Sequence, residues 1–228
     1  SNLLISLNSL DQYISDLHKA TKKKSKEFNE IEKSSSKKYM QLNANILQIE
    51  DEYYGLSRPK SNFISEKRQL SKLYNYGIDY IELRSLDLNP FSRIGIDQKD
   101  LKFLEAFLIF CTIYPSPEIG KSEIKESLEN SHKVSLYGRK KDLQLKKNGV
   151  SISLYDWANE ILSCMNRLFL NLPKHEIDFD SYKNQLSDPN LTLSGRLLIS
   201  QKDLNIGFSE LGQVLGSEHK STLIKKGK

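Results

Sequence analysis

The strand-like segments of this sequence are too few and too polar to make a complete sheet. Residues 42–54 and 78–88 alternate as extended strands do, and both carry charged side chains on at least one face. Two or three strands are not stable alone in water, and they cannot bury two mixed faces. We therefore expect additional strands to come from residues outside these 228 or from a partner chain.

Most of the remaining sequence has helical spacing. Ser9 and Ser153 each stand three residues before a polar partner, the spacing of a capping box that begins a helix. Asp97 precedes an apolar helical run that Pro115 ends. Helices are also expected over 122–131, 179–186 and 191–204, with a short helix or loop ending at 77 and a turn over 138–140. The pattern predicts an α+β fold with a few antiparallel strands and several helices.

The net charge of +5 suggests an acidic partner, but the kind of basic residue argues against nucleic acid. The chain has 27 Lys and only 7 Arg, against 29 acidic residues. Arg makes the bidentate contacts to phosphates and bases that nucleic-acid sites favour. The lysine clusters at 22–24 and 33–38 are therefore interpreted as solvated loops. A non-catalytic basic binding module remains an alternative, and it predicts strongly salt-dependent binding.

The two cysteines and the apolar runs bear on the cellular compartment. Cys111 and Cys164 lie far apart, each within an apolar run, which predicts two buried thiols and no disulfide. The sequence has no Cys/His cluster of the kind that binds zinc. The longest apolar run, 106–114, is too short to span a bilayer, and the start of the sequence lacks signal-peptide features. We expect a cytoplasmic protein without a membrane partner.

The segment Tyr80–Leu86 carries the most informative charges. Residues two apart in a strand point to the same side, about 6.5–7 Å apart, so Glu82 and Arg84 share a face. A glutamate can bind a divalent metal ion on phosphates, while an arginine can pair with the phosphate oxygens. In the other expected strand, Glu50 and Tyr54 share a face in the same way. Either these strands have solvated polar faces with cross-strand ion pairs, or they form a site for metal–nucleotide chemistry.

Five segments, in this order, resemble the proteobacterial type of glutamate–cysteine ligase. They are LNSLDQY, QLNANILQIEDEYYGLSRPK, YIELRSLDLNPFSRIGID, GRK and SDPNLTLSGRLL. The second and third are the most specific, and the resemblance covers about residues 1–204. It implies a glutamine-synthetase-like fold, of which residues 1–210 would be the C-terminal portion of the catalytic domain. The N-terminal half of the enzyme would then be absent, and 211–228 would form a flexible tail.

The resemblance also implies a reaction. Such ligases use ATP to phosphorylate the γ-carboxylate of L-glutamate, and the amino group of L-cysteine attacks the acyl phosphate. The product is γ-glutamylcysteine, the precursor of glutathione, and Mg²⁺ or Mn²⁺ neutralises charge on the phosphates. A related γ-glutamyl ligase with another amine acceptor remains open, because much of the acceptor pocket would lie outside these residues.

Three charged residues take their expected roles from this resemblance. Glu82 corresponds to a metal-ligand glutamate, and Arg84 corresponds to a catalytic arginine at the phosphate end of the site. Glu50 is a second expected metal ligand, with a paired strand carboxylate as its alternative. All three lie in the two most specific segments, so these segments are expected to form the centre of the site.

The substrate-binding residues are expected nearby. Tyr54 corresponds to a tyrosine that lines the amino-acid pocket, and Arg58 and Lys60 of the RPK sequence would lie near the nucleotide phosphates. Arg139 of the GRK sequence is interpreted as a structural turn cation rather than a ligand contact. The sequence departs from the family pattern at Gly195, where a small alanine is usual.

Overall fold

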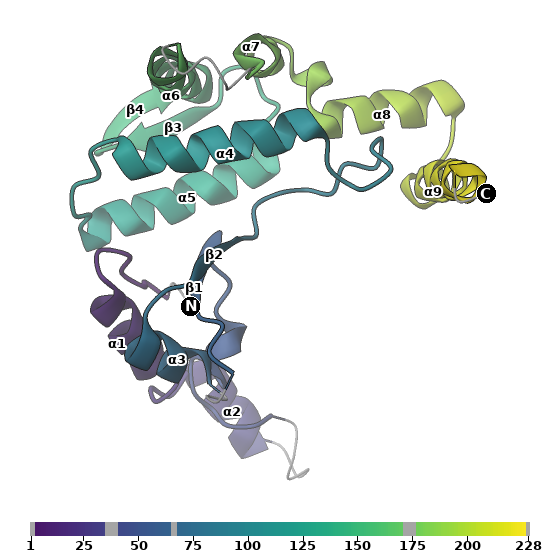
Figure 1. Ribbon diagram of the computed structural model, residues 1–228. Helices are drawn as coiled ribbons and strands as arrows, with labels where there is room; N and C mark the ends of the chain where they lie inside the picture. Colours follow the sequence, from purple (N-terminus) through teal and green to yellow (C-terminus); the bar gives the residue numbers. More distant parts are fainter. Residues whose placement is uncertain (1–2, 35–40, 65–67, 171–176, 227–228) are drawn as a thin grey trace. The chain divides into compact units, whose positions relative to one another are not determined.

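The computed structural model describes residues 3–34, 41–64, 68–170 and 177–226 (Figure 1). It divides into two compact units. Unit 1 consists of Ser1–Leu86 and Glu118–Lys125, and unit 2 consists of Asp87–Pro117 and Glu126–Lys228. Within the described residues, none of the helices combines the length and the apolar character that a bilayer-spanning helix needs.

Unit 1 packs short helices around a small apolar core. Its elements are α1 (Leu10–Ala20), α2 (Lys26–Ser34), the 3-10 turn η1 (Glu50–Glu52), β1 (Ser57–Lys60), α3 (Gln69–Tyr76) and β2 (Tyr80–Leu83). Ser9 caps α1 by accepting a hydrogen bond from the Gln12 amide, which confirms the predicted helix start. Tyr13 and Leu17, one helical turn apart, then point into the core beside Leu73 of α3.

The prediction of a strand over 42–54 was wrong. Asparagine side chains take the hydrogen bonds that a strand ladder would need: Asn43 Oδ1 accepts from the Asn45 amide at 2.9 Å, and Asn45 Nδ2 donates to the Thr21 carbonyl at 2.6 Å. The backbone therefore bends, and the segment ends in η1. The strand begins later, at Ser57, beyond the expected bounds, and it includes Pro59. Proline is tolerated there because β1 pairs on one side only, with β2.

Unit 2 is mainly helical. Its elements are α4 (Gln98–Ile113), α5 (Lys121–Tyr137, whose first residues are counted with unit 1), β3 (Gln144–Lys147), β4 (Val150–Ser153), α6 (Leu154–Phe169), α7 (Phe179–Ser187), η2 (Pro189–Leu191), α8 (Leu193–Leu204) and α9 (Phe208–Lys226). The core lies between α4, α6 and α7, where Ala106, Phe110, Leu162 and Met165 are buried together. The capping box at Ser153 is confirmed, since Ser153 Oγ accepts from the Asp156 amide.

The hairpin of β3 and β4 is a feature that we did not expect. Its two-residue turn, Asn148-Gly149, has φ of 54° and 78°. This left-handed pair is the conformation of the tight hairpin turn that suits twisted antiparallel strands.

Asp97 immediately precedes α4, as expected, but its side chain does not cap the helix. The side chain instead accepts a hydrogen bond from Asn89 Nδ2 at 2.9 Å.

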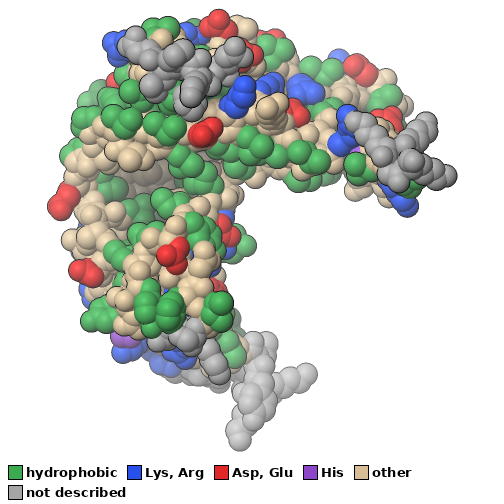
Figure 2. All heavy atoms as spheres, in the orientation of Figure 1, with side chains coloured by type: hydrophobic (Ala, Val, Ile, Leu, Met, Phe, Trp, Pro, Cys, Tyr) green, Lys and Arg blue, Asp and Glu red, His purple; other side chains and the backbone are tan. Residues whose placement is uncertain are grey.

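The expected burial of Cys111 was wrong, while Cys164 lies half-buried beside the core. Helix α4 is apolar on several faces, and only the face with Ala106 and Phe110 is buried. Cys111 follows Phe110 and is exposed, as are Leu108 and Ile113 of the same helix. Hydrophobic side chains also reach the surface on the face of the molecule that Figure 2 shows. The α+β class with few antiparallel strands is confirmed in the described residues.

The structure describes only part of the expected tail and of the second lysine cluster. Residues 211–226 of the expected tail lie within α9, where Leu211 is 1% exposed. That the tail is flexible, and that a domain ends at 210, stay predictions. The lysine cluster at 33–38 lies largely outside the described residues, as do 227–228.

Candidate active site

The pairing of β1 with β2 gathers charged side chains on one face. The strands are antiparallel, with Arg58 opposite Glu82 and Lys60 opposite Tyr80. Directly opposed residues share a face of the sheet, and so do residues two apart along each strand. The Arg84 amide donates to the Leu56 carbonyl at 2.9 Å and extends the pairing by one step. We call Arg58, Lys60, Glu82 and Arg84 the charge cluster.

Glu82 lies at the centre of the charge cluster. Its Oε2 atom accepts a hydrogen bond from Arg84 Nη2 at 3.1 Å and lies 3.9 Å from Lys60 Nζ. The hydrogen bond from Arg84 lowers the pKa of Glu82, and the positive charges of Arg84, Lys60 and Arg58 lower it further. The carboxylate is therefore ionised at neutral pH, as either an ion-pair partner or a metal ligand must be.

Arg58 supports the charge cluster from inside unit 1. It is 4% exposed, and its Nη2 atom lies 3.2 Å from Asp51 Oδ1. A buried guanidinium is costly unless it is paired, and Asp51 supplies that pairing. Burial raises the pKa of the Tyr13 phenol, and the charge of Arg58 opposes that rise, which places the cation close to the aromatic core of the unit. Arg58 thus contributes positive charge beneath the surface of the site.

Tyr54 and Arg84 form the exposed side of the site. The guanidinium carbon of Arg84 lies 4.8 Å from the centre of the Tyr54 ring, a cation–π distance. Tyr54 is 82% exposed, so its ring is available to a ligand. Arg84 Nε is buried and has no hydrogen-bond partner within the described part of the chain. A buried donor without a partner needs a specific explanation, and an acceptor atom of a bound ligand would supply one.

Glu50 makes a different contact from the one we expected. Its Oε1 atom accepts a hydrogen bond from the Leu70 amide at 3.1 Å, in the first turn of α3. Arg68, the residue before that helix, makes no side-chain capping bond of its own. Glu50 therefore satisfies one of the free amides at the start of α3. The structure brings Tyr54, Arg58, Lys60, Glu82 and Arg84 together, but it gives Glu50 a capping contact.

Two acidic residues of the site were not identified from the sequence. Asp51 pairs with Arg58, and Asp79 accepts from the Asn62 amide at 2.6 Å and from Ser61 Oγ at 3.0 Å. These bonds lower the pKa of Asp79 and fix the chain where β1 ends and β2 begins. No periodicity marks either residue, because each contact depends on how the strands pair.

The described side chains fit an anion better than a lone metal ion. Arg58, Lys60 and Arg84 outnumber the acids Glu82 and Asp51, and Lys60 and Arg84 flank the same carboxylate. Phosphate oxygens are natural partners for such cations. No group of three or more His, Cys, Asp or Glu side chains capable of holding a metal ion occurs among the described residues. Glu82 alone, already paired to Arg84, does not make a metal site.

Arg139, by contrast, lies in the exposed turn between α5 and β3. The Lys140 amide closes that turn by donating to the Tyr137 carbonyl at 2.8 Å. This position suits the structural turn cation that we expected.

Comparisons with known proteins show which family the chain is similar to. The family model described as glutamate-cysteine ligase matches residues 1–134, more than half of the chain. The chain is 35% identical to a glutamate–cysteine ligase of Alcanivorax borkumensis over 96% of its own length, and 36% identical to that of Aliivibrio fischeri over 97%. Each alignment covers 44% of the relative, so the chain spans less than half the length of these curated relatives.

Solved structures give the same result. A glutamate–cysteine ligase from Francisella tularensis, solved in complex with AMP, matches 97% of this chain with a TM-score of 0.87 and 29% identity, over 45% of its own length. A bifunctional glutathione synthetase from Pasteurella multocida matches with a TM-score of 0.65 at 19% identity, which indicates a shared fold alone. With the charge cluster inside the matched segment, the chain belongs to the glutamate–cysteine ligase family.

Proposed function

We propose that this chain supplies one wall of the active site of an ATP-dependent ligase that joins L-glutamate to L-cysteine. The charge cluster is the observation that carries the proposal. It sets Lys60 and Arg84 around Glu82 on one face of the β1–β2 pair, within the segment matched by the family. AMP bound to the ligase of Francisella tularensis supports ATP as the nucleotide. The rest of the site would come from residues outside these 228.

The reaction needs positive charge at two stages. An oxygen of the γ-carboxylate of glutamate attacks the terminal phosphorus of ATP, and ADP leaves with the electrons of the broken P–O bond. The amino nitrogen of cysteine then attacks the acyl carbon, phosphate leaves, and the nitrogen loses a proton. Charge on the transferred phosphoryl group is stabilised by fixed cations. We assign that task to Arg84 and Lys60, with the buried charge of Arg58 behind them.

Tyr54 and Glu82 complete the proposed roles. The exposed ring of Tyr54 beside Arg84 would form part of the amino-acid pocket. Glu82 would supply one carboxylate ligand to Mg²⁺ or Mn²⁺, an ion that neutralises phosphate charge when bound. Its other ligands would come from outside the described residues, and Glu50 would have to release the Leu70 amide in order to join it. A cytoplasmic location fits a reaction that needs the thiol of cysteine to stay reduced.

The proposal is tested with the full-length gene product that contains these residues. ADP release is followed with L-glutamate, L-cysteine, ATP and Mg²⁺. We expect Arg84→Ala to lower kcat about 100-fold, the scale of losing one fixed charge donor to a transition state. Glu82→Gln should lower kcat as well, by removing the carboxylate. Lys146→Ala is the control, because Lys146 lies in β3 of unit 2, where its ammonium pairs with Glu129 of α5.

The same assay separates the alternatives. Turnover that is unchanged in both site variants would contradict the assigned roles, and no ADP release with glutamate would contradict the ligase itself. Replacing L-cysteine by other primary amines tests the acceptor. A faster reaction with another amine would identify a related γ-glutamyl ligase on the same scaffold, while preserving the roles of Arg84 and Glu82.

A further inference from the structure

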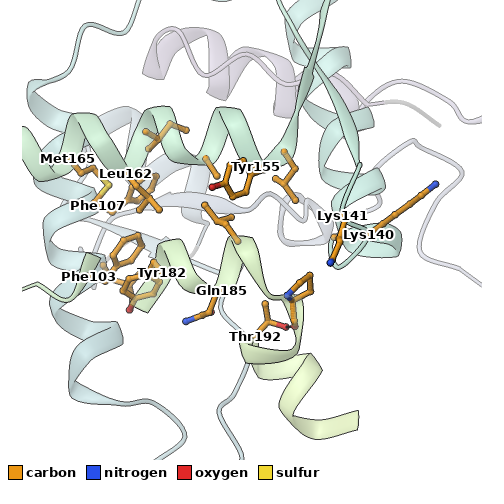
Figure 3. A pocket seen from close by; sticks show the side chains of 17 residues that line it. Phe103, Phe107, Lys140, Lys141, Tyr155, Leu162, Met165, Tyr182, Gln185 and Thr192 are labelled. Carbon is orange, nitrogen blue, oxygen red and sulfur yellow. Dashed lines mark hydrogen bonds between the residues drawn. The ribbon is translucent and has the colours of Figure 1, made fainter. Parts of the chain in front are cut away.

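Unit 2 contains an apolar pocket that the proposed ligase site does not use. It lies between α4, α6 and α7, and the turns at 138–141 and 189–192 lie at one end (Figure 3). The pocket is partly open to solvent, and its volume is about 440 Å³, within the usual range for small-molecule sites. Tyr155 and Met165 both line it and are ten residues apart along α6, a rise of about 15 Å. The pocket is therefore elongated along that helix.

One end of the pocket is aromatic and apolar. Phe103 of α4 stacks on Tyr182 of α7 with ring centres 4.0 Å apart, and Phe107, Leu162 and Met165 lie beside them (Figure 3). The Tyr182 hydroxyl donates to Asp100 Oδ1 at 2.9 Å. Burial and that hydrogen bond raise the pKa of Tyr182 well above its ordinary value, so the phenol stays neutral. This end can accept an apolar group without leaving a polar atom unsatisfied.

The opposite end is cationic. Lys140 and Lys141 line it, and both side chains are exposed (Figure 3). Neither ammonium has an ion-pair or hydrogen-bond partner among the residues that the structure describes. Gln185 of α7 lies between the two ends, and within that same part of the chain its amide is also without a hydrogen-bond partner. The lining of the apolar cavity thus includes two lysines at one end and one amide.

We propose that this pocket binds a small amphiphilic carboxylate, with its apolar body along α6 and its carboxylate at Lys140 and Lys141. The apolar walls exclude a strongly hydrated ligand, because they offer it no replacement hydrogen bonds. The lysines select an anionic head group over a neutral one, and Gln185 can donate to the same carboxylate. This inference does not rest on the proposed ligase function.

Decanoate is a suitable probe, and a methionine of the pocket lining provides the readout. Met165 lines the pocket. With methyl-labelled methionine, we expect decanoate to shift the Met165 resonance saturably. Titration calorimetry should give one site per chain. The neutral probe decanol should bind more weakly.

Variants distinguish the two ends of the pocket. Replacing both Lys140 and Lys141 by alanine should weaken decanoate binding about tenfold, because each exposed ion pair contributes a few-fold. It should leave decanol binding unchanged. Ala158→Phe fills the middle of the pocket and should abolish binding of both probes. Lys202→Ala, on α8 outside the pocket, is the matched charge control.

Several results would overturn the proposal. These are no saturable shift of Met165, equal weakening by Lys202→Ala, or unchanged binding in an Ala158→Phe variant whose circular dichroism is native. If Ala158→Phe does not fold, the lysine pair and the decanol comparison decide the outcome. A Met165 resonance that moves with protein concentration alone would assign the pocket to a second copy of the chain, against the proposal.

Discussion

Replacing Gly195 by alanine is expected to destabilise unit 2, because the added methyl group meets the backbone of η2. A Cβ atom at this position would lie closest to the Pro189 carbonyl oxygen, and 2.7 Å from Asn190 Cα. Real Cβ atoms essentially never show such distances, so either α8 or η2 has to move. The contact bears on the family pattern that the sequence resembles, in which alanine is usual at this position.

The neighbouring hydrogen bonds show why η2 cannot move cheaply. Asp188 Oδ1 accepts from the Asn190 amide at 3.0 Å, and Thr192 Oγ1 donates to the Pro189 carbonyl at 2.6 Å. The same Thr192 oxygen accepts from the Gly195 amide at 3.1 Å and so caps α8. A shift of η2 would weaken the turn and the helix cap together.

Two opposing effects set the magnitude. Overpacking a tight contact costs about 1–3 kcal/mol, whereas alanine in a helix gains about 0.5–1 kcal/mol over glycine. We expect a net loss of about 1–2 kcal/mol. For a chain of this size, that lowers the melting temperature by about 2–8 °C.

The assay is thermal unfolding followed by circular dichroism, with Gly212→Ala as the matched control. Gly212 lies within α9, and a Cβ there would meet nothing within 4 Å. That variant should gain about 0.5–1 kcal/mol from helix propensity alone. If Gly195→Ala were as stable as Gly212→Ala, the close approach of α8 to η2 would be refuted.

Two further predictions concern unit 1. Asp51→Asn should destabilise the protein by about 1–3 kcal/mol in urea unfolding, because it removes the charged partner of buried Arg58. Asp11→Asn, in the exposed first turn of α1, is the control, and an equal effect there would contradict the pairing. The second prediction follows from the lowered pKa of Glu82, whose ordinary value is 4.5. Its contribution to stability is fully present above that value and is lost as the pH falls through the lowered folded-state pKa. The stability difference between the native protein and Glu82→Gln should therefore shrink below about pH 4.5. Thermal melts from about pH 7 to about pH 3 measure it, and a difference that grows on acidification would contradict the ion pairs.

Features set by local contacts could be predicted from the sequence. Ser9 and Ser153 begin helices because each cap involves a residue only three positions away. The Asn148-Gly149 turn was equally local, and it was missed although the dipeptide favours the left-handed backbone of a hairpin. The prediction of a strand over 42–54 was wrong for another reason. Alternation does not reveal that the side chains of Asn43 and Asn45 make hydrogen bonds to backbone groups.

In the candidate site, too, local spacing predicted some features and tertiary contacts decided the others. Glu82 and Arg84 were expected on one face because they are two apart in a strand, and they hydrogen-bond to each other as neighbours on that face. The other ion pairs of the site could not be predicted from residue spacing along the chain. Lys60 reaches Glu82 only through the register of β1 against β2, and Asp51 reaches Arg58 only because the chain bends before β1.

Glu50 is the clearest case in which residue spacing gave the wrong contact. Residue spacing placed it on a strand face with Tyr54, whereas in the fold it caps α3, twenty residues further along the chain. The sequence by itself determined the α+β class, the helix starts, the family resemblance and the shared face of Glu82 and Arg84. Each of these depends on residues close together in the chain or on the order of motifs. Tertiary structure alone decided the burial of Arg58, the strand register and the apolar pocket of unit 2. The physical reason is that pairing and burial depend on side chains brought together from distant segments.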